Sequence, residues 1–190
     1  ALSAYIDIPS FVGKYLVEEV SKNIDSSATS QYFYKDRDGL LYAGPVWDYD
    51  WAYGVERIQE EIDYTDPEGF SARDIPGSLI WWQLLYYNNA FYEDVVTMYE
   101  NVLYPWLNEL VEAGLNQWAQ ELSASAVMDY LRWDRAASET DTAASDDISA
   151  SDDAASSPVQ KAYQAYQEQV EQVRSFLSVR KEFLYREWVG

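Results

Sequence analysis

The chain has 190 residues and a formal net charge of −20, with 13 Lys and Arg against 33 Asp and Glu. Polyanions repel so acidic a protein, which argues against nucleic acid or an anionic membrane as a partner. The chain has no His and no Cys, which excludes Ser-His-Asp and Cys-His nucleophiles and the usual zinc sites. Carboxylates, amides and hydroxyls remain, and these groups suit the hard cations Mg²⁺, Mn²⁺ and Ca²⁺.

The length is sufficient for one compact domain, so we expect residues 1–190 to form a single domain. No apolar run is long enough to span a bilayer, and residues 1–9 lack the basic start and apolar stretch of a signal peptide. Because the chain opens without Met and runs almost at once into a structured segment, we expect it to be part of a longer protein.

The first predicted elements are a helix over residues 10–23 and a β-hairpin after it. Ser10 is the expected N-cap of the helix, and apolar residues follow at helical spacing. Side chains alternate along residues 31–35 and again along residues 40–42, as they do in paired strands. The Asp38-Gly39 step between them suits a turn that needs positive φ.

Acidic residues lie at both ends of this predicted hairpin. Asp25 precedes its first strand, and Asp48 and Asp50 follow its second strand. Because a hairpin returns the chain on itself, we expect the three carboxylates to lie close together. Carboxylates gathered in this way repel one another unless a cation lies between them, so the sequence predicts a divalent-cation site.

The rest of the chain is predicted to be helical with two irregular segments. Residues 52–75 are rich in Asp, Glu, Pro and Gly, and we expect a long surface loop of the kind that forms lids or binding segments. Helices are predicted from Gly77 onward, over residues 91–111 and over residues 115–133. Pro105 is expected to kink or interrupt the second of these, and Gly114 is expected to end it.

Residues 136–157 consist almost wholly of Ala, Ser, Asp and Thr, which predicts a solvated acidic connector; a weak calcium loop and a phosphorylation target are the alternatives. Pro158 opens a long final helix, which Arg174, Arg180 and Arg186 decorate. The fold class expected is therefore mainly α (α+β), a helical bundle with a small antiparallel hairpin near the N-terminus.

The order of the acidic residues is typical of phosphoryl transfer. Protein kinases use one Asp on a catalytic loop to orient the acceptor hydroxyl, an amide five residues later, and a metal-binding Asp after two short strands. In this chain Asp25 comes first, Ser30 and Gln31 stand at about the amide offset, and Asp48 and Asp50 follow the hairpin.

Four strings of residues in the first third of the chain resemble the spore coat protein H (CotH) kinase family: Tyr5-Ile6-Asp7-Ile8-Pro9-Ser10-Phe11, Lys22-Asn23-Ile24-Asp25, Ser30-Gln31-Tyr32-Phe33-Tyr34-Lys35-Asp36 and Gly44-Pro45-Val46-Trp47-Asp48-Tyr49-Asp50-Trp51-Ala52-Tyr53-Gly54. The Gly-Pro-Val-Trp-Asp-aromatic-Asp string is the most specific of them. The resemblance is strong up to Gly54 and looser beyond it.

This resemblance implies the C-terminal lobe of an atypical, secreted protein kinase. It makes Asp25 the catalytic Asp, places Gln31 near the amide ligand of the cofactor, and makes Asp48 and Asp50 metal-binding residues. The implied cofactors are Mg²⁺ or Mn²⁺, with ATP in the full-length protein. The implied acceptor is Ser or Thr of an extracellular or cell-surface bacterial protein. In that family a nucleotide-covering lobe lies upstream, so we expect this chain to be incomplete without it.

Two other functions stay open from the sequence. The acidic residues could bind Ca²⁺ in a non-catalytic adhesion module of an extracellular, polysaccharide-associated or cellulosomal assembly. Paired carboxylates with aromatic neighbours could also belong to a glycoside hydrolase. For the aromatic residues of the helices we expect core packing, whereas Trp51 and Tyr53 are the better candidates for an exposed role.

Overall fold

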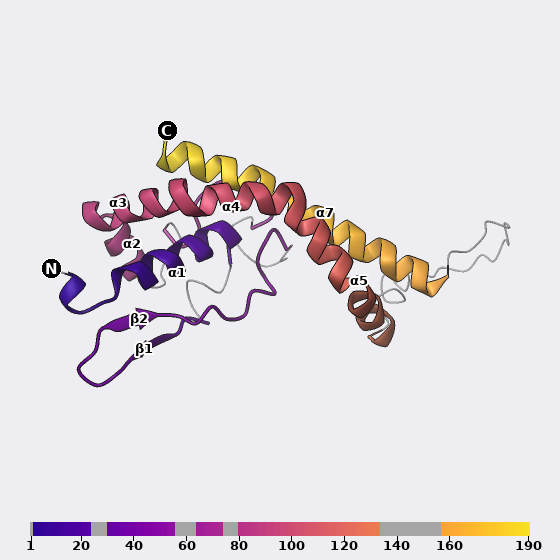
Figure 1. Cartoon of the computed structure of the whole chain (residues 1–190), viewed down its shortest axis with the longest axis horizontal. Helices are drawn as coiled ribbons and strands as arrows, with labels where there is room; N and C mark the ends of the chain where they lie inside the picture. The colour runs from indigo at the N-terminus through magenta and orange to yellow at the C-terminus, as the bar shows by residue number, and fades with distance from the viewer. Residues whose placement is uncertain (1, 24–29, 56–63, 74–79, 134–156) are drawn as a thin grey trace, which may run out of the picture. The chain divides into compact units, whose positions relative to one another are not determined.

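The computed structural model describes residues 2–23, 30–55, 64–73, 80–133 and 157–190 (Figure 1). This part of the chain is mostly helical and has a two-stranded antiparallel sheet near the N-terminus, which confirms the predicted fold class. The described residues group into two compact units, one of Ala1–Val111 with Ser175–Gly190 and one of Glu112–Arg174. The prediction of a single domain stays a prediction. Across the described residues, no helix combines the length and apolar character that crossing a membrane requires.

Helix α1, Ile8–Ser21, begins earlier than predicted. Its N-cap is Asp7, whose carboxylate accepts a hydrogen bond from the backbone N–H of Ser10 at 2.9 Å. The Ser10 hydroxyl in turn donates to the carbonyl oxygen of Asp7, also at 2.9 Å. The prediction of Ser10 as the N-cap is therefore wrong, because a carboxylate three residues earlier satisfies its N–H. The helix ends at Ser21, and its C-cap is Lys22, which adopts the left-handed conformation with φ of 49°.

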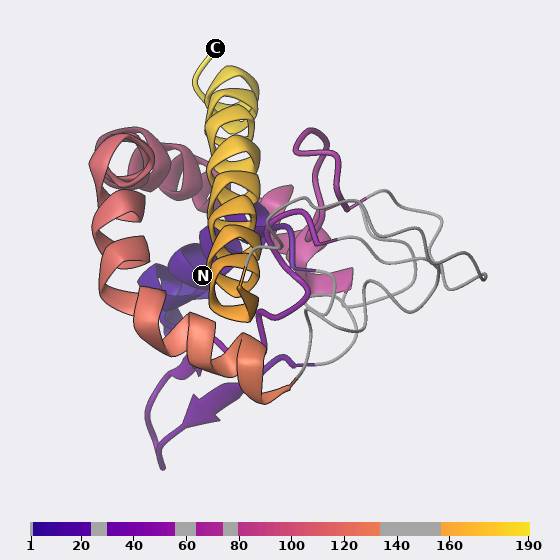
Figure 2. The same ribbon diagram turned by 90° about the vertical axis from the view of Figure 1, so that its right-hand side faces the viewer.

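The predicted hairpin is confirmed as strands β1, Phe33–Lys35, and β2, Leu41–Ala43, which pair in antiparallel register. In its turn, the residue with positive φ is Asp38, at 60°. One face of the hairpin packs on α1, where the rings of Phe33 and Phe11 stack with centroids 5.7 Å apart. In both views the turn lies at the outer edge of the unit, away from its helices (Figures 1 and 2).

The helices of the middle of the chain form one nearly continuous series after α2. Their bounds are α2 Ile80–Tyr86, α3 Asn89–Met98, the π-helical turn η3 Tyr99–Leu103, α4 Tyr104–Glu109, the π-helical turn η4 Leu110–Gly114, and α5 Leu115–Arg132. The expected interruption near Pro105 is confirmed, since η3 breaks the α-helical pattern just before it. The prediction that Gly114 ends a helix is wrong. Gly114 keeps helical angles, φ −61° and ψ −40°, and the chain runs directly into α5.

The core of the first unit is aromatic. Tyr15 of α1 lies at its centre, with the rings of Trp82, Tyr86, Phe91 and Trp188 at centroid distances of 5.8, 5.9, 6.1 and 6.3 Å. These partners come from α2, α3 and the last turn of α7, Pro158–Trp188. Residues that are far apart in the sequence therefore converge on α1, which is the central element of this unit.

The described part of the predicted surface loop contributes to this core. Within residues 64–73, the side chains of Tyr64, Phe70 and Ala72 are buried, and the Phe70 ring packs against Trp188 and Phe183. The prediction of a loop is confirmed for these residues, which form no helix or strand, but the loop is only partly on the surface, because the Phe70 ring finds partners on α7. Residues 56–63 and 74–79 lie outside the described part.

The second unit consists of α5 and the first half of α7, which lie side by side. The Tyr166 hydroxyl donates to the carbonyl oxygen of Ala119 at 3.0 Å, and Arg174 Nη2 donates to Asn116 Oδ1 at 2.7 Å. The predicted final helix is confirmed as α7, which begins at Pro158. The predicted acidic connector, residues 136–157, lies outside the described residues except for its last position.

Candidate functional site

Three of the four predicted site residues lie in the described part of the chain. Asp25 lies outside it, so the predicted convergence of three carboxylates stays a prediction. Asp48 and Asp50 are both exposed, and Gln31 is half-buried. The structure brings Ser30 to Asp48, with its hydroxyl 3.5 Å from Asp48 Oδ2. Ser30, which precedes Gln31 at about the expected amide offset, therefore lies next to the acidic segment that follows the hairpin.

Tyr49, between these two aspartates, points to the interior. Its hydroxyl donates to Glu18 Oε1 at 2.8 Å and accepts from Lys14 Nζ at 3.2 Å. Lys14 and Glu18 are themselves an ion pair at 2.5 Å, one turn apart on α1, and both side chains are almost fully buried. We call these three residues the Lys14–Glu18–Tyr49 network. It joins the Asp48–Asp50 segment to the helix that precedes the hairpin.

The electrostatics of this network follow from its burial. Desolvation raises the pKa of the Glu18 carboxyl, and the hydrogen bond and charge of Lys14 oppose this shift. Desolvation also raises the pKa of Tyr49, and the negative charge of Glu18 raises it further. The Tyr49 hydroxyl therefore stays protonated at ordinary pH and can donate a hydrogen bond to the Glu18 carboxylate.

The backbone of the acidic segment adopts uncommon angles. Asp48 and Tyr53 have positive φ, 65° and 60° respectively. Asp tolerates this left-handed region better than most residues, because its short side chain bonds locally. A second attachment to α1 lies just beyond, where the backbone N–H of Tyr53 donates to the carbonyl oxygen of Ser21 at 2.8 Å. Asp48 and Asp50 therefore belong to a segment that α1 holds at two points.

Gly54 ends this segment at a close approach to α7. Its φ is 82°, and a Cβ at this position would lie 2.8 Å from Cδ2 of Phe176, a buried ring. Gly69 offers a comparison, because it has a similar φ of 74° but open space around its Cα.

Replacing Gly54 with alanine is expected to lower the free energy of unfolding by about 1–3 kcal/mol more than replacing Gly69 with alanine. Both substitutions incur the cost of a positive φ, and only the first also forces a Cβ against Phe176. Urea unfolding of the two variants measures the difference. Equal losses would show that the contact between Gly54 and Phe176 relaxes at no cost.

A second buried network lies at the C-terminal end of α1. Arg180 Nη2 pairs with Glu19 Oε2 at 3.1 Å, and neither side chain is exposed. The Glu19 carboxylate also accepts the backbone N–H groups of Ser71 and Arg73, at 2.8 and 2.9 Å. The Arg180 guanidinium donates to the carbonyl oxygen of Pro67 at 2.9 Å. This network fixes residues 64–73 and α7 against the turn of α1 that leads toward Asp25.

The donor groups of the acidic segment are of the chemical type that a hard divalent cation prefers. Asp48 and Asp50 offer exposed carboxylate oxygens, and Ser30 offers a hydroxyl. Within the described ranges there is no group of three or more acidic residues that could hold a metal ion. Mg²⁺ is often bound by one or two carboxylates, with waters and substrate phosphates completing its coordination, so a donor set of this size is suitable.

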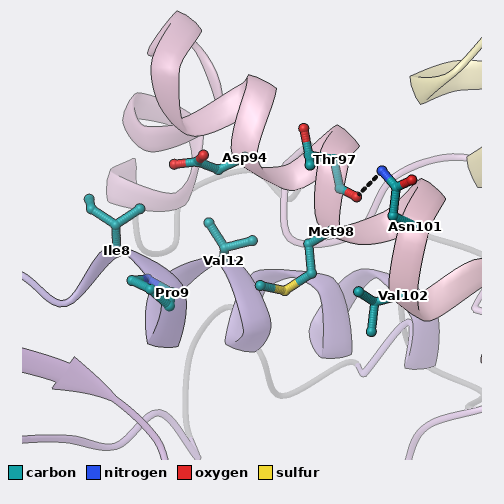
Figure 3. Close-up of a pocket in the computed structure, with 8 residues that line it drawn as sticks. All are labelled: Ile8, Pro9, Val12, Asp94, Thr97, Met98, Asn101 and Val102. Atoms are coloured by element: carbon teal, nitrogen blue, oxygen red, sulfur yellow. Dashed lines mark hydrogen bonds between the residues drawn. The ribbon is translucent and has the colours of Figure 1, made fainter.

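An apolar cavity lies elsewhere in this unit, lined by described residues of α1, α3 and η3. A cavity of about 440 Å³ separates the first turns of α1 from α3 and η3 (Figure 3). Figure 3 shows Ile8 and Val12 facing Met98 and Val102 across it. The charged residue in its lining is Asp94, an anion, which would repel a phosphate group. This cavity therefore does not suit the phosphates of a nucleotide, and no predicted site residue lines it.

Lys14, Glu18, Glu19 and Arg180 are the residues that reasoning from the sequence missed. Lys14 and Glu18 stand four residues apart in the predicted helix, a spacing that also occurs in exposed ion pairs. The available signal was their position in a helix with apolar residues on most sides. For Arg180 the sequence offered no such signal, because its partner is 161 residues away.

The helix, the β-hairpin and the Asp-x-Asp segment follow one another in the order predicted from the sequence. Residues 1–184 match the protein family described as CotH kinase protein. The chain therefore belongs to the CotH kinase family, as its resemblance to that family predicted. Searches of curated proteins and of solved structures found no match to this chain.

Proposed function

We propose that this chain is the metal-binding and acceptor-binding part of a phosphotransferase that moves phosphate from a nucleotide to Ser or Thr of a protein. The observation that carries the proposal is the pair of exposed carboxylates, Asp48 and Asp50, on a segment anchored to α1, in a chain of the CotH kinase family. Phosphoryl transfer depends mainly on positioning and on offsetting the charge of the phosphates.

Each residue has a distinct part in this proposal. Asp48 and Asp50 hold Mg²⁺ or Mn²⁺, which, when bound, offsets the negative charge of the nucleotide phosphates. Asp25 orients the acceptor hydroxyl and takes its proton, and Gln31 contributes an amide near the cofactor. With a net charge of −20, the protein needs a metal ion or nearby Arg and Lys side chains to offset its repulsion of a polyphosphate.

The acceptor and the location are part of the proposal. We propose a secreted or surface protein as the acceptor and an extracellular or cell-surface location, as the family resemblance implies. Family membership supports the general reaction, a kinase-like transfer of phosphate. ATP as the donor and the nature of the acceptor rest on the resemblance alone.

Replacing Asp48 with asparagine is expected to reduce phosphate incorporation by the full-length protein about 100-fold or more, because a metal ligand is lost. Asparagine is the suitable replacement, since it keeps the size of the side chain and tolerates the positive φ of this position. Transfer of labelled phosphate from ATP to a mixture of secreted proteins, at saturating Mn²⁺, measures the effect.

Replacing Asp94 with asparagine is the matched control, because it removes an exposed carboxylate from α3 without touching the acidic segment. Incorporation should stay within about twofold of the wild type, as for a surface change away from the site. Equal incorporation by the Asp48 variant and the wild type would end the proposal. Tight Ca²⁺ binding without any phosphate transfer would favour the non-catalytic adhesion module instead.

A further inference from the structure

The Asp48–Asp50 segment alternates between the surface and the interior. Asp48 and Asp50 are exposed, whereas the Tyr49 side chain between them reaches Lys14 and Glu18, which are 4% and 0% exposed. The Lys14 ammonium also lies 5.4 Å from the centre of the Tyr49 ring. The position of the ring is thus fixed at its hydroxyl by two hydrogen bonds, one to Glu18 and one from Lys14.

Stability alone does not account for the buried ion pair. Replacing such a pair with apolar residues of similar volume is often neutral or stabilising, because both charges must lose their water. Lys14 also precedes Glu18 on the helix, which is the less favourable order for a pair four residues apart. Charged partners fix the orientation of the Tyr49 hydroxyl, because each hydrogen bond to it requires a particular geometry. Apolar partners would not fix that orientation.

We propose that Lys14, Glu18 and Tyr49 are positioning residues that hold Asp48 and Asp50 in the geometry needed to bind a divalent cation. The Tyr49 backbone is covalently joined to both aspartates, so fixing its ring limits where their carboxylates can go. This matters because a displacement of about 1 Å in a reacting site can cost about 100-fold in rate. Groups that orient metal ligands typically contribute about 10- to 100-fold in metal affinity or activity.

Among the described residues, the network supplies one of the two attachments of this segment to α1 that are reported above. The other is the hydrogen bond from the Tyr53 N–H to the Ser21 carbonyl, which does not involve the Tyr49 hydroxyl. Removing that hydroxyl should therefore loosen the segment locally without unfolding the unit. The role of the bound cation in phosphate transfer rests on the proposed function, whereas the attachment of the segment does not.

The test is Tyr49→Phe in the full chain, which keeps the ring and the Lys14–Glu18 pair and removes only the hydroxyl. Titration with Mn²⁺, followed by electron paramagnetic resonance of the free ion, should show a dissociation constant about 10-fold or more above the wild type. Amide hydrogen exchange of peptides covering residues 44–54 should become faster, while the melting temperature changes little. Tyr34→Phe, which removes a hydroxyl from an exposed side chain of β1, is the matched control. It should change neither the dissociation constant for Mn²⁺ nor the rate of amide hydrogen exchange.

A second variant, Lys14→Met with Glu18→Leu, removes both partners and leaves the Tyr49 hydroxyl in place. It should weaken Mn²⁺ binding as much as Tyr49→Phe does, and combining all three changes should add little. Unchanged exchange in Tyr49→Phe, or unchanged Mn²⁺ affinity in a segment that has loosened, would overturn the positioning role. If the wild type itself binds no Mn²⁺, the proposed function fails, and hydrogen exchange still decides whether the network holds the segment.

Discussion

Replacing Arg180 with methionine is expected to lower the free energy of unfolding by about 3–5 kcal/mol, as for other buried pairs that lose one partner. Methionine fills part of the volume of the side chain but leaves the Glu19 carboxylate buried without its counter-charge. The carbonyl oxygens of Pro67 and Gly69 also lose the donor that reaches them from α7. Urea unfolding followed by far-ultraviolet circular dichroism measures the loss.

Replacing Arg186 with methionine is the matched control for this prediction. Arg186 lies on the same helix and pairs with Glu68 at 3.3 Å, but both of these side chains are more than half exposed. An exposed pair contributes about 0–1 kcal/mol, so the control should change stability little. Adding Glu19→Gln to the Arg180 variant should restore part of the loss, since it removes the uncompensated charge. Equal stability of the two arginine variants would contradict the prediction.

Replacing Trp82 with alanine is expected to destabilise the chain by about 3–5 kcal/mol, the usual range for removing a large buried ring. Trp82 is 1% exposed, and its ring lies 6.1 Å from that of Phe11 and 5.8 Å from that of Tyr15. The substitution leaves a cavity among α1 and α2 that rigid neighbouring rings cannot easily fill. Circular dichroism is the suitable measurement, because removing a tryptophan also changes the fluorescence signal.

Replacing Trp106 with alanine removes a side chain of the same size from α4, where it is 48% exposed. Because this side chain leaves no closed cavity, its loss should cost about 1 kcal/mol or less. A cost equal to that of the Trp82 variant would mean that burial does not set the size of the effect. Core packing was predicted for both of these helical tryptophans. The prediction is confirmed for Trp82, which is buried, and wrong for Trp106, which is exposed.

Much of the local structure could be predicted from the sequence. The alternation of side chains around Asp38-Gly39 predicted the hairpin, and helical spacing predicted α1 and α7 to within a few residues. Patterns of this kind are local, because a strand or helix shows its period over a few neighbouring residues. The position of Asp48 and Asp50 in the segment that follows the second strand could be predicted from the same pattern.

Other predictions failed. Gly114 was expected to end a helix, yet it lies within helical structure that continues into α5, because a single glycine costs a helix only about 1 kcal/mol and does not have to end it. Residues 64–73 were expected on the surface because of their acidic composition. Phe70 packs on α7, and Glu19 accepts the backbone N–H groups of Ser71 and Arg73, so the segment is partly buried.

The sequence by itself determined that this protein is an acidic, mainly helical member of a kinase-like family, with an Asp-x-Asp segment placed after a hairpin. Only the tertiary structure decided which charges are buried and with whom they pair. Lys14 with Glu18 and Glu19 with Arg180 have the composition of ordinary surface ion pairs, and their burial depends on Tyr49 and on a helix at the other end of the chain. The physical reason is that a charge is buried only with partners, and here these partners come from segments far apart in the sequence. The local spacing of residues, from which helices and strands are predicted, contains no information about such contacts.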